Sequence, residues 1–355
     1  MKPTLQTVAD AVGVSRSTVS NAYGRPDQLS PELRERILTA ARELGYAGPN
    51  PTARSLRRGR AGAIGVLFTD VLSYAFRDPF AVRFLQGLSL AAERHQTGLL
   101  LIPVPDDPEA ARAAVRNAAV DGFCVFCVAE GHPARQAIFE RGLPVVGTEL
   151  LAGDPEMLAA GIDEAAATRA AGMHLTALGH RRVAIVADML HPAISPLGTV
   201  VREPSDVSYL GESERLRGYQ QAWRKAGLDW DEVTIVNVRG NSREAGVEGA
   251  AQVLDRRDRP TALVAFSDVI ALGTMDALRA RGLRAGRDVS VIGFDDIPQA
   301  AEAGLTTVRQ PATEKGRIAG ELLLDPPATA EGRRVALPTE LIVRASTGPA
   351  PDGRN

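Results

Sequence analysis

The sequence predicts a helical segment over residues 1–48 followed by a larger α/β domain with parallel sheets. In the first part, apolar residues recur at a spacing of three and four, and glycines interrupt the pattern. From residue 62 onward, short apolar runs alternate with amphipathic helical segments, a pattern typical of parallel sheets covered by helices on both faces. A length of 355 residues is enough for two or three such domains.

Three short helices are predicted in the N-terminal segment. Each follows a side chain that commonly caps a helix, and glycines stand after the first and third. The predicted helices are Leu5–Val12, Arg16–Tyr23 and Pro31–Leu44, after the caps Thr4, Ser15 and Ser30. Helix, glycine turn and second helix is the geometry with which many proteins enter the major groove of DNA.

The charge is distributed unevenly along the chain. The formal net charge is −2, but residues 1–60 carry +5 and the remainder carries −7. A basic segment joined to an acidic body predicts a polyanionic partner for the basic segment alone.

Composition excludes several classes of protein. No apolar run approaches the roughly 20 residues that span a bilayer, and no secretory signal is recognisable at the start, so we expect a cytoplasmic protein without membrane contact. Cys124 and Cys127 lie in Gly122–Val128, an apolar run with strand character that would direct them to opposite faces, so we expect neither a metal nor a redox role. Because dinucleotide, phosphate-loop and nucleophile-elbow motifs are missing, we expect no cofactor and no enzyme activity.

The N-terminal motifs closely resemble those of lac-repressor-type transcriptional regulators. The resemblance rests on the segments 4–20, 29–37 and 41–46. It implies a helix-turn-helix head in which Arg16, Ser17 and Asn21 take the base-reading positions, although many relatives carry arginine in place of Asn21. Arginine suits guanine and asparagine suits adenine. The predicted DNA-binding residues of the head are Thr4, Ser15, Arg16, Ser17, Thr18, Ser20 and Asn21.

Residues 49–61 form a short basic stretch bracketed by proline and glycine. Taken alone, so short a stretch would be a flexible linker. The resemblance implies that it is the hinge, which folds into a helix on operator DNA and pairs with its twofold mate in the minor groove. Leu56 matches the residue that wedges between base pairs. The predicted hinge contacts are Asn50, Ala53, Leu56 and Arg57.

The larger domain, residues 62–345, resembles the effector domain of the same family, which has the two-lobed fold of periplasmic sugar-binding proteins. Segments 177–183, 215–219, 291–297, 305–311 and 337–344 carry the resemblance. We expect one lobe over residues 62–159 and 294–323, and the other over 160–293 and 324–345. The polar tail 346–355 is predicted to be disordered.

The candidate effector-binding residues stand at predicted strand ends and helix starts, where ligands bind in parallel sheets. They match ligand-contacting positions of the family, and their carboxylates and arginine suit a sugar or a related polar metabolite. They are Asp78, Phe80, Glu149, Arg215, Ser267, Asp268, Asp295 and Gln310. Three departures from the family pattern stand out: Ser267 replaces the usual asparagine, Asn241 stands where some sugar-responsive members carry an aromatic residue, and segment 188–213 is either an insertion over the cleft or a loop.

We therefore expect a homodimeric, ligand-responsive repressor that binds a palindromic operator on double-stranded DNA. A twofold protein is the geometric match to a palindrome. The effector can act as inducer or as corepressor, and a tetramer remains an alternative to the dimer. A solute-binding protein without a DNA role is the competing hypothesis, but it would carry a secretion signal and no basic head.

Overall fold

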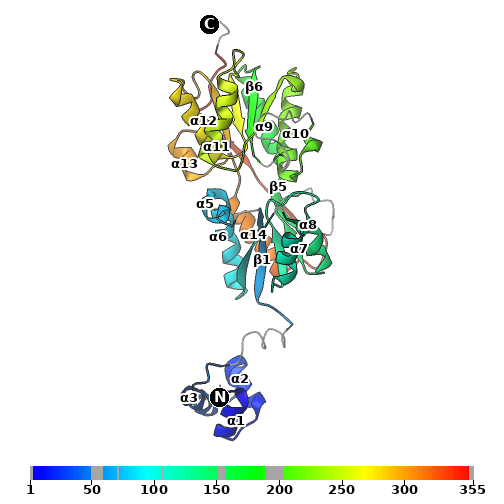
Figure 1. Cartoon of the computed structure of the whole chain (residues 1–355), viewed down its shortest axis with the longest axis vertical. Coiled ribbons are helices and arrows are strands. Elements are labelled where there is room, and N and C mark those ends of the chain that lie inside the picture. The colour runs from blue at the N-terminus through cyan, green and yellow to red at the C-terminus, as the bar shows by residue number, and fades with distance from the viewer. Residues whose placement is uncertain are drawn as a thin grey trace. The chain divides into compact units, whose positions relative to one another are not determined.

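The chain forms two compact units, Met1–Gly62 and Ala63–Asn355 (Figure 1). The computed structural model describes residues 3–48, 59–69, 72–105, 107–150, 157–188, 190 and 203–351. Among these residues, we find no helix with the length and apolar character needed to cross a bilayer.

The first unit is a small bundle of the three predicted helices and one additional turn of 3-10 helix. The helices are α1 (Leu5–Val12), α2 (Arg16–Gly24), η1 (Pro26–Gln28) and α3 (Pro31–Glu43). Val8 of α1, Val19 of α2 and Ile37 of α3 are completely buried and form the centre of its core. Tyr23 and Tyr46 pack edge to face at 6.1 Å beside this core.

The second unit contains two lobes, each built on a six-stranded sheet. Lobe 1 has the strand order β11-β5-β4-β3-β1-β2, and lobe 2 has the order β12-β10-β9-β8-β6-β7. The strands of lobe 1 are β1 (Ala63–Thr69), β2 (Gly98–Val104), β3 (Gly122–Val125), β4 (Val145–Gly147), β5 (Leu158–Ile162) and β11 (Arg334–Leu337). Those of lobe 2 are β6 (Val183–Ala187), β7 (Thr234–Asn237), β8 (Ala262–Ala265), β9 (Ser290–Asp295), β10 (Thr306–Arg309) and β12 (Glu340–Ile342). All the pairings between these strands are parallel except that of β10 with β12.

Helices cover both faces of each sheet, as the alternating pattern predicted. The helices of lobe 1 are α5 (Tyr74–Arg77), α6 (Pro79–Arg94), α7 (Pro108–Asn117), α8 (Pro133–Glu140) and α14 (Ala312–Leu324). Those of lobe 2 are α9 (Glu164–Ala177), α10 (Leu210–Lys225), α11 (Arg243–Leu254), α12 (Asp268–Ala280) and α13 (Pro298–Glu302), with the 3-10 turns η2 (Pro204–Asp206) and η3 (Trp230–Glu232).

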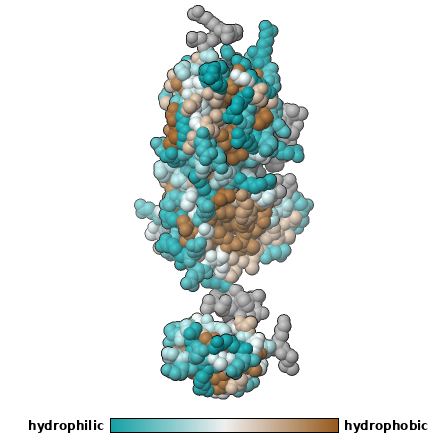
Figure 2. All heavy atoms as spheres, turned by 90° about the vertical axis from the view of Figure 1, so that its left-hand side faces the viewer, coloured by the Kyte–Doolittle hydropathy of each residue, from teal (hydrophilic) through white to brown (hydrophobic). Residues whose placement is uncertain are grey.

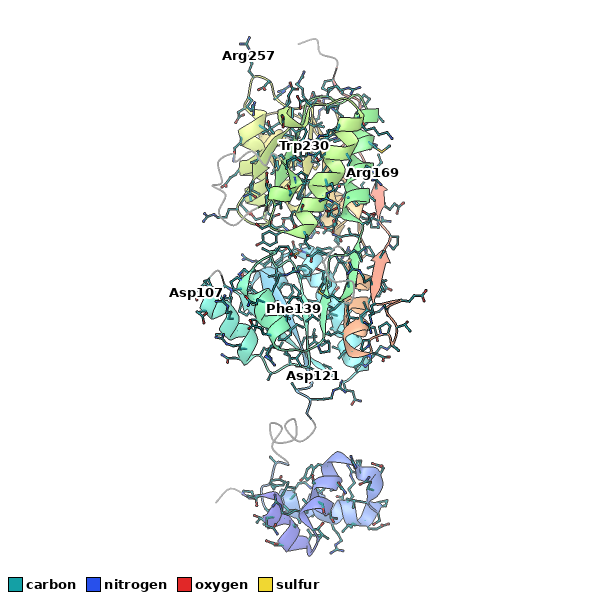
Figure 3. All side chains as sticks on the ribbon, turned by 90° about the vertical axis from the view of Figure 1, so that its right-hand side faces the viewer. Asp107, Asp121, Phe139, Arg169, Trp230 and Arg257 are labelled. Atoms are coloured by element: carbon teal, nitrogen blue, oxygen red, sulfur yellow. The ribbon has the colours of Figure 1, made fainter. Side chains whose placement is uncertain are left out.

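Four apolar clusters, one on each sheet face, hold these layers together. In lobe 1, α6 and α14 pack over one face, and α7 and α8 pack over the other. In lobe 2, α9 and α10 cover one face, and α11 and α12 cover the opposite face. Trp230 of lobe 2 packs against Trp223, with ring centroids 6.0 Å apart (Figure 3). The two lobes are therefore separate three-layer sandwiches.

One face of lobe 1 carries an apolar surface. Phe76 on α5, Leu90 on α6 and Leu100 on the edge strand β2 are among the most exposed large apolar side chains of the described residues. Both α5 and β2 contact α6. Figure 2 shows a broad hydrophobic area on this side of the lobe.

The chain passes between the lobes at points that differ from those predicted. Strand β10 pairs with β9 and so belongs to lobe 2, whereas β11 pairs with β5 in lobe 1. The predicted assignment of 294–323 to lobe 1 and of 324–345 to lobe 2 is therefore wrong for these two strands. Both are four residues long, too short for alternation to reveal which sheet they join.

The predicted disorder of the tail is also wrong for residues 346–351. The buried Ser346 hydroxyl donates to the carbonyl oxygen of Val291 at 2.7 Å and accepts from the amide of Thr306 at 2.7 Å. His180, buried in lobe 2, lies with Nε2 3.1 Å from the carbonyl oxygen of Gly348 and 2.9 Å from the hydroxyl of Ser290, which anchors the tail to this lobe. Residues 352–355 lie outside the described part of the chain.

Candidate functional site

Helix α2 presents the predicted base-reading residues on one face. Arg16 and Ser17 are exposed, and Ser20 and Asn21 follow one turn later and are half-buried. Val19, on the opposite side of the helix, is completely buried in the core. The structure thus brings these four residues together on a surface that can enter a DNA groove.

The remaining predicted residues of the head shape the ends of the helices. Thr4 forms a capping box with Thr7 at the start of α1. The Ser15 hydroxyl accepts from the amide of Thr18 at 3.1 Å and lies within hydrogen-bond distance of the hydroxyls of Ser17 and Thr18. Such helix N-termini offer amide protons to phosphate oxygens.

Asn21 already uses part of its hydrogen-bonding capacity inside the head. Its Nδ2 donates to Oε1 of Gln28 at 3.2 Å. One amide proton and the amide oxygen remain available, and these are the donor and the acceptor that bidentate pairing with adenine uses. The predicted hinge contacts Asn50, Ala53, Leu56 and Arg57 lie outside the described residues.

The junction between the two lobes, called the cleft below, collects most of the predicted effector-binding residues. From lobe 1, Asp78 caps α6 and is 4% exposed, and Glu149 follows β4. From lobe 2, Ser267 caps α12, and Asp295 ends β9. The cause is the parallel topology, which places the carboxyl ends of all these strands at the same edge of each sheet.

Arg215 on α10 is anchored on three sides. Its Nε donates to Oε2 of Glu164 at 2.8 Å, and its Nη1 donates to the carbonyl oxygen of Phe266 at 2.6 Å. The guanidinium also stacks on the ring of Phe294, 3.8 Å from the centroid. Nη2 is the guanidinium nitrogen for which the described residues provide no such partner, so a ligand can use it. The sequence prediction missed Glu164, because an acidic residue at the start of a helix such as α9 is usually an exposed residue of the first turn.

Asp268 is placed differently from the other predicted effector-binding residues. It is completely buried, with Oδ1 accepting from the hydroxyl of Thr307 at 2.6 Å and Oδ2 from the amide of Ile297 at 2.9 Å. These bonds tie α12 to the segments around β9 and β10. The geometry assigns Asp268 to the support of the cleft rather than to its surface.

Asp295 and Gln310 form a pair beneath the cleft. Nε2 of Gln310 donates to Oδ1 of Asp295 at 2.6 Å, while the buried Oε1 of Gln310 has no hydrogen-bond partner among the described residues. Asp295 adopts a φ of +114°, a backbone conformation that is costly for a residue other than glycine. Burial raises the pKa of Asp295, although the positive charge of Arg215 acts against this shift.

Three further carboxyl groups of the cleft also have raised pKa values because they are buried. Burial, opposed by Lys315, raises the pKa of Glu149 to about 7. Burial and the nearby Glu212 raise the pKa of Asp188 to about 7, and burial also raises that of Glu212. Sequence reasoning missed Asp188 and Glu212. Asp188 directly follows β6, which is the same signal that identified Glu149. Glu212 lies in the first turn of α10, three residues before the predicted site residue Arg215.

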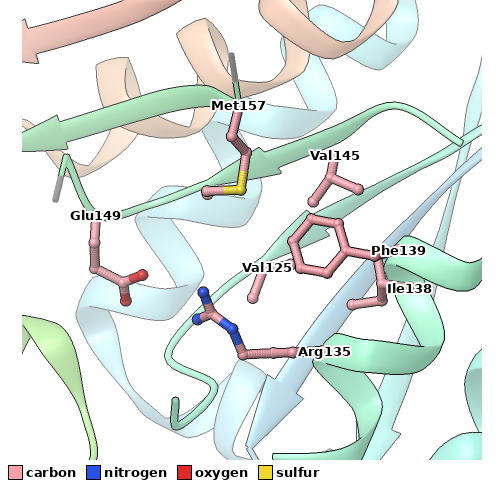
Figure 4. Close-up of a pocket in the computed structure, with 8 residues that line it drawn as sticks. Val125, Arg135, Ile138, Phe139, Val145, Glu149 and Met157 are labelled. Atoms are coloured by element: carbon pink, nitrogen blue, oxygen red, sulfur yellow. The ribbon is translucent and has the colours of Figure 1, made fainter. Parts of the chain in front are cut away.

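Glu149 borders a small pocket at the ends of β3 and β4. In Figure 4 its carboxylate and the guanidinium of Arg135 on α8 are turned toward one another, with Met157 beside them. Arg135 is held by an ion pair with Glu130 at 2.8 Å. Its positive charge favours the ionised form of Glu149 and so partly offsets the cost of burial.

The predicted separation of the two cysteines needs correction. Strand β3 ends at Val125, so Cys127 lies beyond it, with a φ of +49°. Cys124 is completely buried, Cys127 is half-buried, and both contact the same apolar cluster of lobe 1. Opposite strand faces therefore do not separate them.

The raised pKa of Glu149 predicts a stability that falls as pH rises. The protonated form is favoured in the folded state, so this group's contribution is complete below the ordinary pKa of 4.5 and is lost as pH increases through about 7. Urea unfolding at about pH 5 and about pH 8 should show this loss, and Glu149→Gln should make it smaller. An unchanged difference between the two pH values in the variant would contradict the assignment.

Comparisons with known proteins agree with this architecture. Residues 4–50 match the model of bacterial regulatory proteins of the lacI family, and residues 173–347 match that of periplasmic binding protein-like domains. An HTH-type transcriptional regulator of Mycobacterium tuberculosis is 39% identical over 350 residues, which cover 98% of each chain. The chain belongs to the LacI family. The regulator IpsA of Corynebacterium glutamicum is 41% identical over 90% of each chain.

Solved structures of LacI-family proteins have the same fold. A LacI-family regulator from Corynebacterium glutamicum aligns with a TM-score of 0.74 and 35% identity over 99% of this chain and all of that chain. The complex of the regulator CelR with cellobiose has a TM-score of 0.67 and 29% identity over 97% of this chain and 99% of that chain. The lac repressor dimer bound to operator has a TM-score of 0.76 and covers 98% of this chain and 99% of that chain, but at 24% identity it shows the fold alone. A helix-turn-helix head joined to a two-lobed periplasmic-binding-protein-like domain is thus the family architecture.

Proposed function

We propose that this LacI-family regulator is a homodimeric repressor that binds a palindromic operator and is controlled by a small molecule in the cleft. Two observations together support this proposal. Helix α2 has an exposed polar face, and the second unit has two lobes between which polar side chains converge. Ligand binding between lobes changes their relative position, and this difference can be coupled to DNA affinity.

The charges of the cleft favour an uncharged ligand rich in hydroxyl groups. Its five carboxyl groups outnumber the three cations Arg215, Lys315 and Arg135, and two of these cations are already paired, Arg215 with Glu164 and Arg135 with Glu130. Buried carboxyl groups accept hydrogen bonds from hydroxyl groups, and in their ionised form they repel phosphate or carboxylate groups. The cleft carboxylates are Asp78, Glu149, Asp188, Glu212 and Asp295. Relatives support a sugar or polyol, since the CelR complex contains cellobiose and a LacI-family structure from Enterococcus faecium contains ribose.

The apolar surface formed by Phe76, Leu90 and Leu100 fits a second copy of the chain (Figure 2). Exposed apolar areas of this kind commonly mark protein interfaces. A twofold dimer would also present two recognition helices to the two halves of a palindrome. Sedimentation of the full-length protein as a monomer at micromolar concentration would contradict this part of the proposal.

Selection of binding sites from random duplex DNA tests the proposal directly. The effector-free protein should enrich a palindrome with half-sites about one helical turn apart. Arg16→Ala should weaken binding by about 1–3 kcal/mol and relax the preference at one base in each half-site. An equal loss on every sequence would instead make Arg16 a phosphate contact, and no enrichment with or without cell extract would overturn the DNA-binding role.

A ligand titration on the recovered operator tests the cleft. Neutral sugars and polyols should change operator affinity, and their phosphorylated forms should have no effect. A response to the phosphorylated forms alone would contradict the proposed ligand class.

A further inference from the structure

A single amide side chain joins the caps of two helices that belong to different lobes. Oδ1 of Asp78 accepts from the amide of Ala81 at 2.7 Å and caps α6 in lobe 1. Oγ of Ser267 accepts from the amide of Ile270 at 3.2 Å and caps α12 in lobe 2. Between them lies Asn241, whose Nδ2 donates to Oδ2 of Asp78 and whose Oδ1 accepts from the hydroxyl of Ser267, both at 2.5 Å.

This connection differs from the other hydrogen bonds that join the lobes in the described residues. The guanidinium of Arg83 donates to the carbonyl oxygen of Asp296 at 3.3 Å, and the amide of Glu130 donates to the carbonyl oxygen of Ser208 at 2.8 Å. Both of these bonds end on the backbone. The bond from Asn241 ends on a buried carboxylate, and hydrogen bonds to charged groups are the stronger kind.

Asn241 also uses hydrogen-bonding groups that a ligand would need. Asp78 and Ser267 are both residues that we expect to contact the effector, and an amide offers them the donor and the acceptor that a sugar hydroxyl would offer. Tyr74, at the start of α5 in lobe 1, lies beside both Asp78 and Asn241. The chain therefore supplies its own bridge where a ligand bridge is expected.

We propose that Asn241 is a latch that holds the two lobes together in the effector-free protein. An entering effector then replaces an existing bridge between Asp78 and Ser267 instead of creating the first one. The closed arrangement is populated without ligand, and the effector shifts the equilibrium only by the difference between its own contacts and those of Asn241. The latch is independent of the identity of the effector.

Cys127 provides a natural probe of lobe opening. Its half-buried thiol lies near Glu149 of lobe 1 and Glu212 of lobe 2, and burial raises its pKa. Cys124, the other cysteine of the chain, is completely buried. Separation of the lobes would expose the thiol of Cys127 and favour its thiolate, so labelling by a disulfide reagent such as DTNB should accelerate.

The experiment compares DTNB labelling rates of the full-length, effector-free protein and its variants. Asn241→Ala should raise the rate about tenfold, because it removes two hydrogen bonds from the closed state. The matched control is Ser242→Ala at the neighbouring position, which removes one bond to the amide of Ala245 within lobe 2 and should leave the rate unchanged. Cys127→Ser should abolish the accelerated labelling.

Two outcomes with the alanine variants would overturn the latch. One is a folded Asn241→Ala protein that labels at the wild-type rate, and the other is an equal acceleration in Ser242→Ala, which would indicate a loosened lobe 2. A second variant, Asn241→Asp, keeps the side-chain size but places a carboxylate against Asp78, so it should also accelerate labelling. If Asn241→Ala does not fold, a folded Asn241→Asp protein with wild-type labelling refutes the proposal.

Discussion

Replacing Arg215 by alanine is expected to lower the free energy of unfolding of the effector domain by about 3–5 kcal/mol. The reason is Glu164, which is 8% exposed and loses its ion-pair partner at 2.8 Å. The stacking of the guanidinium on Phe294 is lost as well. Urea denaturation followed by tryptophan fluorescence measures the effect, because Trp223 and Trp230 lie in the core of lobe 2.

The double variant Arg215→Ala with Glu164→Gln separates the charge effect from the packing effect. It should recover part of the lost stability, since the buried carboxylate is no longer left without a partner. Arg281→Ala is the matched control, because Arg281 forms its ion pair with the exposed Asp255 and should leave the denaturation midpoint nearly unchanged. Equal midpoints for Arg215→Ala and Arg281→Ala would contradict the importance of burial. A functional test at Arg215 therefore has to control for stability.

The sequence predicted the element pattern well where periodicity was long. Helices α1, α2 and α3 start at the predicted residues and end within one residue of the predicted ends. The prediction failed on β10 and β11, because a four-residue strand carries no periodic signal and its partner is set by long-range packing. The ordered tail was missed because Ser346 acts through distant partners, the amide of Thr306 and the carbonyl group of Val291.

For the candidate site, reasoning from the carboxyl ends of parallel strands identified residues that the structure brings together. It placed Asp78, Glu149 and Asp295 at the cleft, because the position of a strand end can be read from an apolar run. It did not distinguish Asp268 from these residues. Strand position alone does not reveal whether a carboxylate faces a ligand or, as Asp268 does, accepts internal hydrogen bonds from Thr307 and Ile297. The excess of hydrogen-bond acceptors in the cleft and the role of Asn241 depend on how the two lobes face each other, which the sequence does not show.

The two-lobed topology also depends on close helix crossings that the sequence did not reveal. Helix α14 returns from lobe 2 to lie against α6 in lobe 1, and glycines face the partner helix at the crossing. A Cβ on Gly87 would lie 1.8 Å from the carbonyl oxygen of Thr313, and one on Gly316 would lie 1.9 Å from that of Phe84. Because both obstacles are backbone atoms, no side-chain rotation can relieve the contact.

Gly87→Ala is therefore expected to destabilise lobe 1 by about 3 kcal/mol, although alanine is the better helix former. The added methyl group must push α14 away from α6, and α14 carries part of the apolar cluster that covers the lobe 1 sheet. Gly211→Ala on α10 is the control, since a Cβ there meets open space and should leave stability unchanged or raise it by at most about 1 kcal/mol. Both variants can be compared by urea denaturation of the full-length protein.

If the two alanine substitutions shift the denaturation midpoint in the same direction and by similar amounts, helix propensity governs the effect. A large loss confined to Gly87→Ala would show that the crossing of α6 and α14 requires glycine.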